Sequence, residues 1–302
     1  MLTALPGPVK GAFAFLLFGL NTVFWCTLLY VVALVRLVVP GAGAKKGLTR
    51  AAMAIGENWV SVNSWGIDAV GPIGWDVVLP EGLRRDGWYL IGCNHLSLVD
   101  IAVLQRVFNR RIPLLKFFIK RQLIRVPILG LAWWALDFPF MKRHTREEIE
   151  RNPALRGEDL ETTRRACEKF RWAPVSVMNF LEGTRFTEAK RERRKSPYRH
   201  LLPPKAGGIA FALAAMGDVF ERFLDVTIVY PGGTPGFWDL LCGRMPKVIV
   251  RVESIPVPRE WTGGDYEGDA AFREAFQAEV RRLWEKKDAL VGTLLGEERA
   301  AG

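Results

Sequence analysis

The sequence predicts an α/β protein: one globular domain with a central mixed sheet flanked by helices, preceded by an N-terminal membrane helix or helical hairpin. Short runs rich in aromatic and β-branched residues alternate with segments whose apolar residues recur at helical spacing, and this alternation is typical of α/β domains. Residues 11–35 contain no charged side chain. This uncharged stretch places membrane-associated helices over 1–70. A chain of 302 residues is long enough to bury a full core besides, so we expect one globular domain over 71–302.

The first segment is long enough to cross a hydrocarbon core of about 30 Å as a helix. It lacks the short apolar core and small-residue cleavage site of a removable signal peptide. Residues 48–70 predict a second, more amphipathic helix after the break at 40–43, so a simple span and a hairpin lying on the membrane both stay open. The excess of positive charge after the first helix predicts the cytoplasmic (inner) membrane, with the globular domain facing the cytoplasm; the residues are Arg36, Lys45, Lys46 and Arg50, against Lys10.

The composition indicates an anionic partner, because the net charge is +10 and 11% of residues are aromatic. A membrane surface and a nucleic acid both fit that charge, but the apolar N-terminus argues against a soluble nucleic-acid binder. We therefore expect an anionic membrane surface and no nucleic acid. The four cysteines, at 26, 93, 167 and 242, show no paired or metal-binding spacing, so we expect reduced thiols and no metal.

The strands of the globular domain are predicted from short apolar runs bounded by turn residues. They lie at 75–79, 88–93, 113–119, 174–179, 224–230 and 248–252. Apolar spacing predicts helices at 101–108, 158–170, 205–216 and 270–295. A capping box at Thr145–Glu148 predicts one more short helix, which Pro153 ends.

Residues 123–134 form a dense apolar segment that Pro127 and Gly130 interrupt. Large apolar side chains are usually buried, so we expect this segment in the core. The alternative is a wall for an acyl chain or a surface that dips into lipid.

The first candidate site follows the strand at 88–93 and reads Asn-His-Leu-Ser-Leu-Val-Asp over 94–100. His95 and Asp100 have four residues between them, so they meet only if the turn folds His95 back over the helix start. In that geometry the carboxylate would fix the imidazole tautomer and leave the other ring nitrogen to take a proton from a hydroxyl. The alternative is a capping pattern, because Ser97-x-x-Asp100 stands at a helix start.

The second candidate site follows the strand at 174–179 and reads Phe-Leu-Glu-Gly-Thr-Arg over 180–185. Together, Asn94-His95-x-Ser97-x-x-Asp100 and Phe180-x-Glu182-Gly183-Thr184-Arg185 resemble the motifs of the 1-acylglycerol-3-phosphate O-acyltransferase family. The resemblance spans roughly residues 75–255 and is nearest to the long-chain, membrane-bound bacterial members. Arg143, after an apolar pair, and Lys205, in Lys-Ala-Gly, are similar to further family positions.

The resemblance implies transfer of a fatty acyl chain from acyl-CoA or acyl carrier protein to the free hydroxyl of 1-acyl-sn-glycerol-3-phosphate, in phospholipid synthesis. It implies His95 as the general base, Asp100 as the group that orients it, and no cofactor or metal. The implied substrate-binding residues are Asn94, Ser97, Arg143, Glu182, Gly183, Thr184, Arg185 and Lys205. Arginine suits a phosphate-bearing acceptor because it can bind phosphate in a bidentate way, and Gly183 would let the backbone approach the ligand.

Three alternatives stay open. The acceptor could be another lysophospholipid, such as lysophosphatidylglycerol, in phospholipid remodelling. A thioesterase or lipase could use Ser97 or Cys93 as nucleophile, although Ser97 lacks the glycines of a nucleophile elbow. A non-catalytic membrane-binding protein would also account for the charge.

Overall fold

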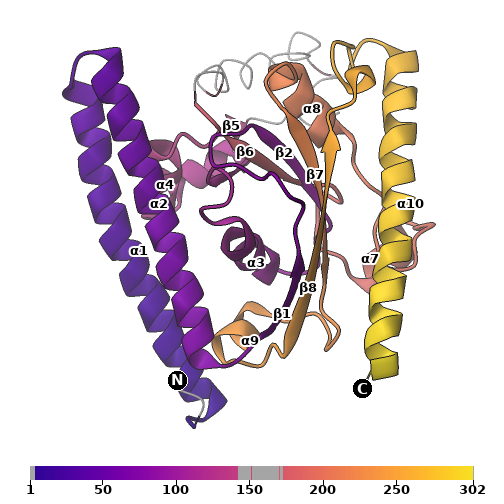
Figure 1. The fold of residues 1–302 in the computed structure, drawn as a ribbon, viewed down its shortest axis with the longest axis horizontal. Coiled ribbons are helices and arrows are strands. Elements are labelled where there is room, and N and C mark those ends of the chain that lie inside the picture. The colour runs from indigo at the N-terminus through magenta and orange to yellow at the C-terminus, as the bar shows by residue number, and fades with distance from the viewer. Residues whose placement is uncertain (1–3, 142–150, 152–169, 171–172, 302) are drawn as a thin grey trace.

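The protein is built around a six-stranded mixed sheet, seen in a computed structural model that describes residues 4–141, 151, 170 and 173–301 (Figure 1). The strands are β1 (Gly74–Val78), β2 (Tyr89–Cys93), β3 (Leu115–Phe117), β6 (Ser176–Phe180), β7 (Arg222–Val229) and β8 (Lys247–Pro256). Their order across the sheet is β1-β8-β7-β2-β6-β3. Only the β7–β8 pairing among these neighbours is antiparallel, so the predicted mixed sheet is confirmed.

Helices cover both faces of this sheet, and β2 shows why. Its side chains alternate: Ile91 and Cys93 pack in one core with α3 (Val99–Phe108), whereas Leu90 packs in a second core with α8 (Gly207–Met216) and α10 (Ala270–Ala301). All five residues of β2 are buried, as expected for a strand covered on both faces. Shorter helices complete the described chain: η1 (Arg121–Arg125), α4 (Leu129–Ala135), α7 (Glu188–Arg193), α9 (Phe237–Leu241) and η4 (Arg259–Trp261).

The N-terminal segments form an antiparallel hairpin of α1 (Gly7–Val38) and α2 (Ala42–Val70), on the opposite side of the molecule from α10 (Figure 1). Buried Asn21 holds the pair together, because its side-chain amide donates to the Trp59 carbonyl at 3.0 Å and to Asn63 Oδ1 at 2.8 Å. Among the described residues, α1 is the one helix that is long and apolar enough to cross a membrane. Only 17% of its most apolar stretch of 18 residues is buried inside the protein. Helix α1 therefore presents its apolar side chains outward, which is consistent with membrane association.

Both ends of α1 also contact the globular part. Near its start, Gly11 packs against the side chains of Trp238 and Cys242. Near its end, Arg36 forms an ion pair with Asp137 at 2.7 Å. The globular part therefore lies alongside the whole length of α1. Helix α2 ends at Val70 and β1 begins at Gly74, while the division into two domains at this point stays a prediction.

The expectation that residues 123–134 lie in the core was wrong for most of the large side chains there. The following are exposed by 38–50%: Leu123, Ile124, Ile128, Leu131 and Trp134. The small side chains Ala132 and Ala135 are instead the buried ones, and they pack in one cluster with Leu29 and Ala33 of α1. Because α4 turns its small residues toward α1, its large apolar residues face outward beside the hairpin.

Two other expectations differ from the structure. The single strand predicted at 113–119 is divided: β3 pairs with β6, and after Phe118 the chain enters β4 (Ile119–Lys120), which pairs with β5 (Phe140–Met141) in a separate sheet. The second predicted helix begins at residue 42, six residues earlier than expected. The helices predicted near 145–153 and 158–170 lie almost wholly outside the described residues.

Candidate active site

The two sequence motifs meet because of the sheet topology. β2 lies between β6 and β7 and runs parallel to both, so the carboxyl ends of these three strands share one edge of the sheet, where open α/β sheets bind ligands. His95 follows β2, Glu182 follows β6 and Tyr230 follows β7. Backbone hydrogen bonds join the first two turns directly: Phe186 N–H donates to the His95 carbonyl at 2.7 Å, and Leu181 N–H to the Cys93 carbonyl at 3.1 Å.

His95 and Asp100 are in contact, as the catalytic interpretation requires. His95 Nδ1 lies 2.9 Å from Asp100 Oδ2, and the same oxygen accepts from the backbone N–H groups of Leu96 at 2.7 Å and Ser97 at 2.9 Å. The Asp100 side chain is fully buried. A carboxylate can only accept hydrogen bonds, so Nδ1 carries a proton, and in the neutral imidazole Nε2 is then the acceptor. The capping and catalytic interpretations thus describe the same carboxylate, which fixes both the turn and the imidazole.

Tyr230 is a site residue that the sequence analysis missed. Its hydroxyl donates to Asp100 Oδ1 at 2.7 Å. Burial and the negative charge of Asp100 raise the pKa of Tyr230 well above its ordinary value, so the phenol stays protonated and remains a donor. Its position at the end of a strand next to β2 was the available signal, but the strand order needed to use it is not visible in the sequence.

Glu182 joins the two motif turns from inside the protein. Its Oε1 accepts from His95 N–H at 2.9 Å and its Oε2 from Leu202 N–H at 3.0 Å, and the side chain is fully buried. Burial raises the pKa of Glu182 to about 7, against the opposing effect of the two N–H donors. The carboxylate is therefore engaged with the backbone and not with Arg185.

Asn94 and Ser97 are also engaged within the protein. The Asn94 amide donates to the Ile228 carbonyl and accepts from Ile228 N–H, both at 2.9 Å, which fastens the turn to β7. The Ser97 hydroxyl donates to the Pro235 carbonyl at 2.5 Å and accepts from Val99 N–H at 3.1 Å. Both side chains are buried, so their polar atoms hold the turn in place.

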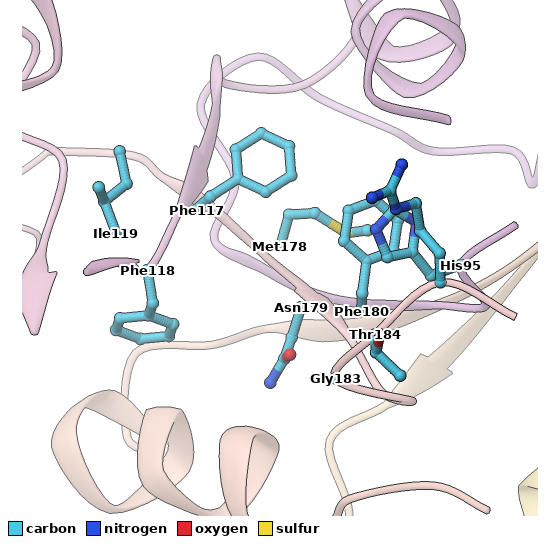
Figure 2. Close-up of a pocket in the computed structure, with 10 residues that line it drawn as sticks. His95, Phe117, Phe118, Ile119, Met178, Asn179, Phe180, Gly183 and Thr184 are labelled. Atoms are coloured by element: carbon cyan, nitrogen blue, oxygen red, sulfur yellow. The ribbon is translucent and has the colours of Figure 1, made fainter. Parts of the chain in front are cut away.

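His95 opens into a pocket of about 320 Å³, which we call the catalytic pocket (Figure 2). One wall is aromatic: the Phe180 ring stacks on the His95 ring with centroids 3.9 Å apart, and Figure 2 shows the Phe117 side chain on the same side of β6 as Met178. The polar wall comes from the second motif, where Gly183, Thr184 and Arg185 line the pocket. The catalytic pocket thus combines an imidazole, an apolar surface and an arginine.

The second motif presents its cation through a tight turn. Gly183 has φ of +64°, a conformation that favours glycine. Lys190 braces the turn, because its ammonium donates to Thr184 Oγ1 at 2.9 Å and to the Arg185 carbonyl at 2.8 Å. The Arg185 side chain is left exposed at the pocket. Lys190 begins a stretch rich in basic residues, 190–199, and the structure places its ammonium on this turn.

Of the last two implied substrate-binding residues, Lys205 and Arg143, the structure describes only Lys205. The Lys205 side chain lies beside Gly183: its Cδ is 3.1 Å from the position a Cβ would take there. Arg143 lies outside the described residues. Within the described part of the chain, the acidic, histidine and cysteine side chains form no group of three or more that could hold a metal ion.

Comparison with known proteins agrees with the motifs. Residues 75–231, more than half of the chain, match the family model described as acyltransferase. The mouse 1-acyl-sn-glycerol-3-phosphate acyltransferase gamma is 26% identical over 187 residues, which cover 58% of this chain and 44% of that protein. The 2-acyl-1-lysophosphatidylinositol acyltransferase of Saccharomyces cerevisiae is 23% identical over 249 residues, covering 66% of this chain and 59% of that protein. The chain thus spans about half the length of these curated relatives.

The fold has a counterpart among solved structures. The crystal structure of the 1-acyl-sn-glycerophosphate acyltransferase from Thermotoga maritima superposes with a TM-score of 0.53, over 95% of this chain and 97% of that chain, at 17% sequence identity. This similarity supports the same overall fold over nearly the whole chain. Together with the family model that matches residues 75–231, it confirms the resemblance carried by the two motifs: the chain belongs to the 1-acylglycerol-3-phosphate acyltransferase family.

Proposed function

We propose that the protein transfers a fatty acyl chain from a thioester, acyl-CoA or acyl carrier protein, to the free hydroxyl of 1-acyl-sn-glycerol-3-phosphate. The observation that carries the proposal is the buried Asp100 on His95 Nδ1, which leaves Nε2 free to accept a proton in a pocket that also contains Arg185. Membership of the family and the activities for which its relatives are named support the same reaction class.

In this reaction His95 Nε2 takes the proton of the acceptor hydroxyl while the hydroxyl oxygen attacks the thioester carbonyl carbon. The new C–O ester bond forms, the C–S bond breaks, and the proton returns from His95 to the leaving thiolate. Asp100 holds the imidazole in the required tautomer and stabilises its charged form. Direct transfer needs both substrates held together, so much of the acceleration comes from positioning.

We propose that Asn94, Ser97 and Glu182 shape the site and do not touch substrate, which revises the contacts implied by the family resemblance. Each is buried and bonded to backbone groups. Gly183, Thr184, Arg185 and Lys205 keep their predicted place at the substrate, with Arg185 as the main phosphate ligand.

Neither of the nucleophiles considered for a hydrolase, Ser97 and Cys93, is available at the catalytic pocket. The Ser97 hydroxyl is buried against the Pro235 carbonyl. Cys93 is fully buried, and burial raises the pKa of its thiol well above the ordinary value, whereas a nucleophilic cysteine needs a lowered one. Among acceptors, the yeast relative is named for acylation of lysophosphatidylinositol, which favours a lysophospholipid with a different head group as the second candidate.

We infer that the hairpin lies along the cytoplasmic membrane and does not cross it. Both ends of α1 contact the same globular part, at Trp238 and at Asp137, so a perpendicular helix would pull that part into the bilayer. The Tyr30 hydroxyl of α1 donates to the carbonyl of Ile128, which immediately precedes α4. This hydrogen bond holds the two helices together, with their exposed apolar side chains beside each other. They form one surface suited to interfacial binding.

A charge on this surface should weaken membrane binding. Leu131 is 50% exposed on α4, and we expect Leu131→Glu to lower the fraction bound in vesicle sedimentation several-fold, because a buried apolar side chain contributes about 1.5–3 kcal/mol. Leu290→Glu is the matched control: Leu290 is 36% exposed on α10, on the far side of the molecule from the hairpin (Figure 1). Equal loss of vesicle binding in both variants would contradict the assignment.

The acceptor assignment is tested by removing the arginine. Arg185→Ala should raise KM for 1-acyl-sn-glycerol-3-phosphate by roughly tenfold or more, because a charge-assisted hydrogen bond contributes about 1.5–3 kcal/mol. KM for a monoacylglycerol, which has no phosphate, should stay unchanged in steady-state assays. Arg193→Ala, in the exposed part of α7, is the control. An equal rise for both acceptors would show that Arg185 does not bind the phosphate.

A further inference from the structure

A second cavity of about 410 Å³ lies beside the catalytic pocket, between the segment 197–207 and α10. We call it the lateral pocket; its lining includes Pro203, Lys205, Tyr266, Gln277 and Arg281. The two pockets adjoin at Lys205, whose side chain lines the lateral pocket and packs beside Gly183 of the catalytic pocket. A long ligand could therefore occupy both by passing Lys205.

The lining of the lateral pocket combines positive charge with a fixed aromatic ring. Lys205 and Arg281 supply the cations. The Tyr266 ring packs edge-on against Phe276 with centroids 5.7 Å apart, and its hydroxyl accepts from the Gln277 amide at 2.9 Å. Tyr266 is partly exposed, so this immobilised ring presents a surface to the pocket. Arginine recognises phosphate, and planar bases stack on aromatic rings.

The acidic residues near the lateral pocket leave these cations available. Asp288 is engaged, since it accepts from the backbone N–H groups of Arg199 and His200 at 3.0 and 2.8 Å. Glu285, one turn of α10 beyond Arg281, does not line the pocket. The lining is thus cationic, in a protein of net charge +10.

We propose that the lateral pocket binds the adenosine-phosphate end of an acyl-CoA donor, so that the pantetheine arm passes Lys205 and brings the thioester to His95. This inference rests on the proposed acyl transfer. It separates two phosphate sites: Arg185 serves the acceptor on one side of Lys205, and Arg281 serves the donor on the other. The donor nucleotide and the acceptor head group then bind without competing.

The test uses the full chain and two variants of adjacent residues, Arg281→Ala and Arg282→Ala. Arg282 pairs with Glu279 at 3.0 Å and does not line the lateral pocket. Arg281→Ala should raise KM for acyl-CoA roughly tenfold and leave KM unchanged for the same acyl group on pantetheine, which has no nucleotide, and for the lysolipid acceptor. Arg282→Ala should match wild type. Adenosine 3′,5′-bisphosphate, followed by calorimetry, should bind wild type and bind Arg281→Ala about tenfold more weakly.

The outcomes separate this proposal from the acyl transfer on which it rests. If wild type uses both donors but Arg281→Ala keeps the wild-type KM for acyl-CoA and the wild-type affinity for adenosine 3′,5′-bisphosphate, the lateral pocket is not the nucleotide site and the acyl transfer stands. An equal rise in KM for acyl-CoA and acyl-pantetheine would also overturn the nucleotide assignment. If wild type transfers from neither thioester but transfers from acyl carrier protein, the donor assignment fails and the acyl transfer stands. If it transfers from none of the three, the proposed function fails and the donor assignment with it.

Discussion

His95→Ala should lower kcat for acyl transfer by about 10³-fold or more, because general base catalysis contributes roughly 10²–10⁴-fold and this variant removes the acceptor nitrogen altogether. The fold should persist: the His95 ring is near the surface of the catalytic pocket, and its loss leaves Asp100 still bonded to Leu96 N–H, Ser97 N–H and the Tyr230 hydroxyl. The measurement is single-turnover acyl transfer beside thermal unfolding of both proteins.

His200→Ala is the matched histidine control. His200 lies against α10, with Nε2 3.4 Å from the position a Cβ at Gly292 would take, and it does not line the catalytic pocket. This variant should keep the wild-type kcat. Turnover within tenfold of wild type in His95→Ala would contradict the assignment of His95 as the base.

Glu182→Gln should lower kcat by about 10²-fold without touching a substrate contact. Glutamine offers one acceptor oxygen where the carboxylate offers two, so its amide N–H would face either His95 N–H or Leu202 N–H in a buried site. An unsatisfied buried group costs about 1–3 kcal/mol, and a small displacement of a catalytic group can cost 10²-fold in rate. Glu188→Gln, on the exposed surface of α7, is the control. A wild-type kcat in Glu182→Gln would show that the two backbone hydrogen bonds to Glu182 do not position His95.

The same variant should change how stability depends on pH. Burial raises the pKa of Glu182 to about 7 in the folded protein, above the value of about 4.3 for an unfolded glutamate. The contribution of Glu182 to stability is therefore fully present below about pH 4 and is lost as pH rises through about 7. Between pH 5 and 8 the stability of wild type relative to Glu182→Gln should fall, by on the order of 2 kcal/mol. Unfolding midpoints of both proteins across this range measure the fall; a constant difference would contradict the raised pKa.

Much of the fold could be predicted from local patterns. Each strand of the main sheet coincides with a short apolar run, and α3 begins within two residues of its predicted start. Strand order could not be predicted, because it depends on which buried faces match after the chain has folded. The segment 123–134 shows a second limit: apolar composition predicts removal from water, but does not distinguish a protein core from a surface that meets lipid.

Those parts of the candidate site that lie within the two sequence motifs could be predicted. The contact between His95 and Asp100 follows from spacing once the turn folds back, and the same carboxylate accepts from Ser97 N–H as the capping interpretation expects. The catalytic role of the pair stays a prediction. Tyr230 and Lys190 were missed as contacts because they reach the motifs from separate elements. The structure also gives Glu182 two backbone partners that the pattern Phe-x-Glu-Gly-Thr-Arg does not reveal.

The most direct test of the central claim is the stoichiometry of transfer by the purified wild-type protein. With a labelled acyl thioester and a panel of lysophospholipids, thiol release and new acyl ester are measured in the same samples. Acyl transfer through His95 predicts one ester formed per thiol released, with 1-acyl-sn-glycerol-3-phosphate as the best acceptor. Thiol release accompanied by free fatty acid, at the same rate with and without an acceptor, would instead make the protein a thioesterase and contradict the account.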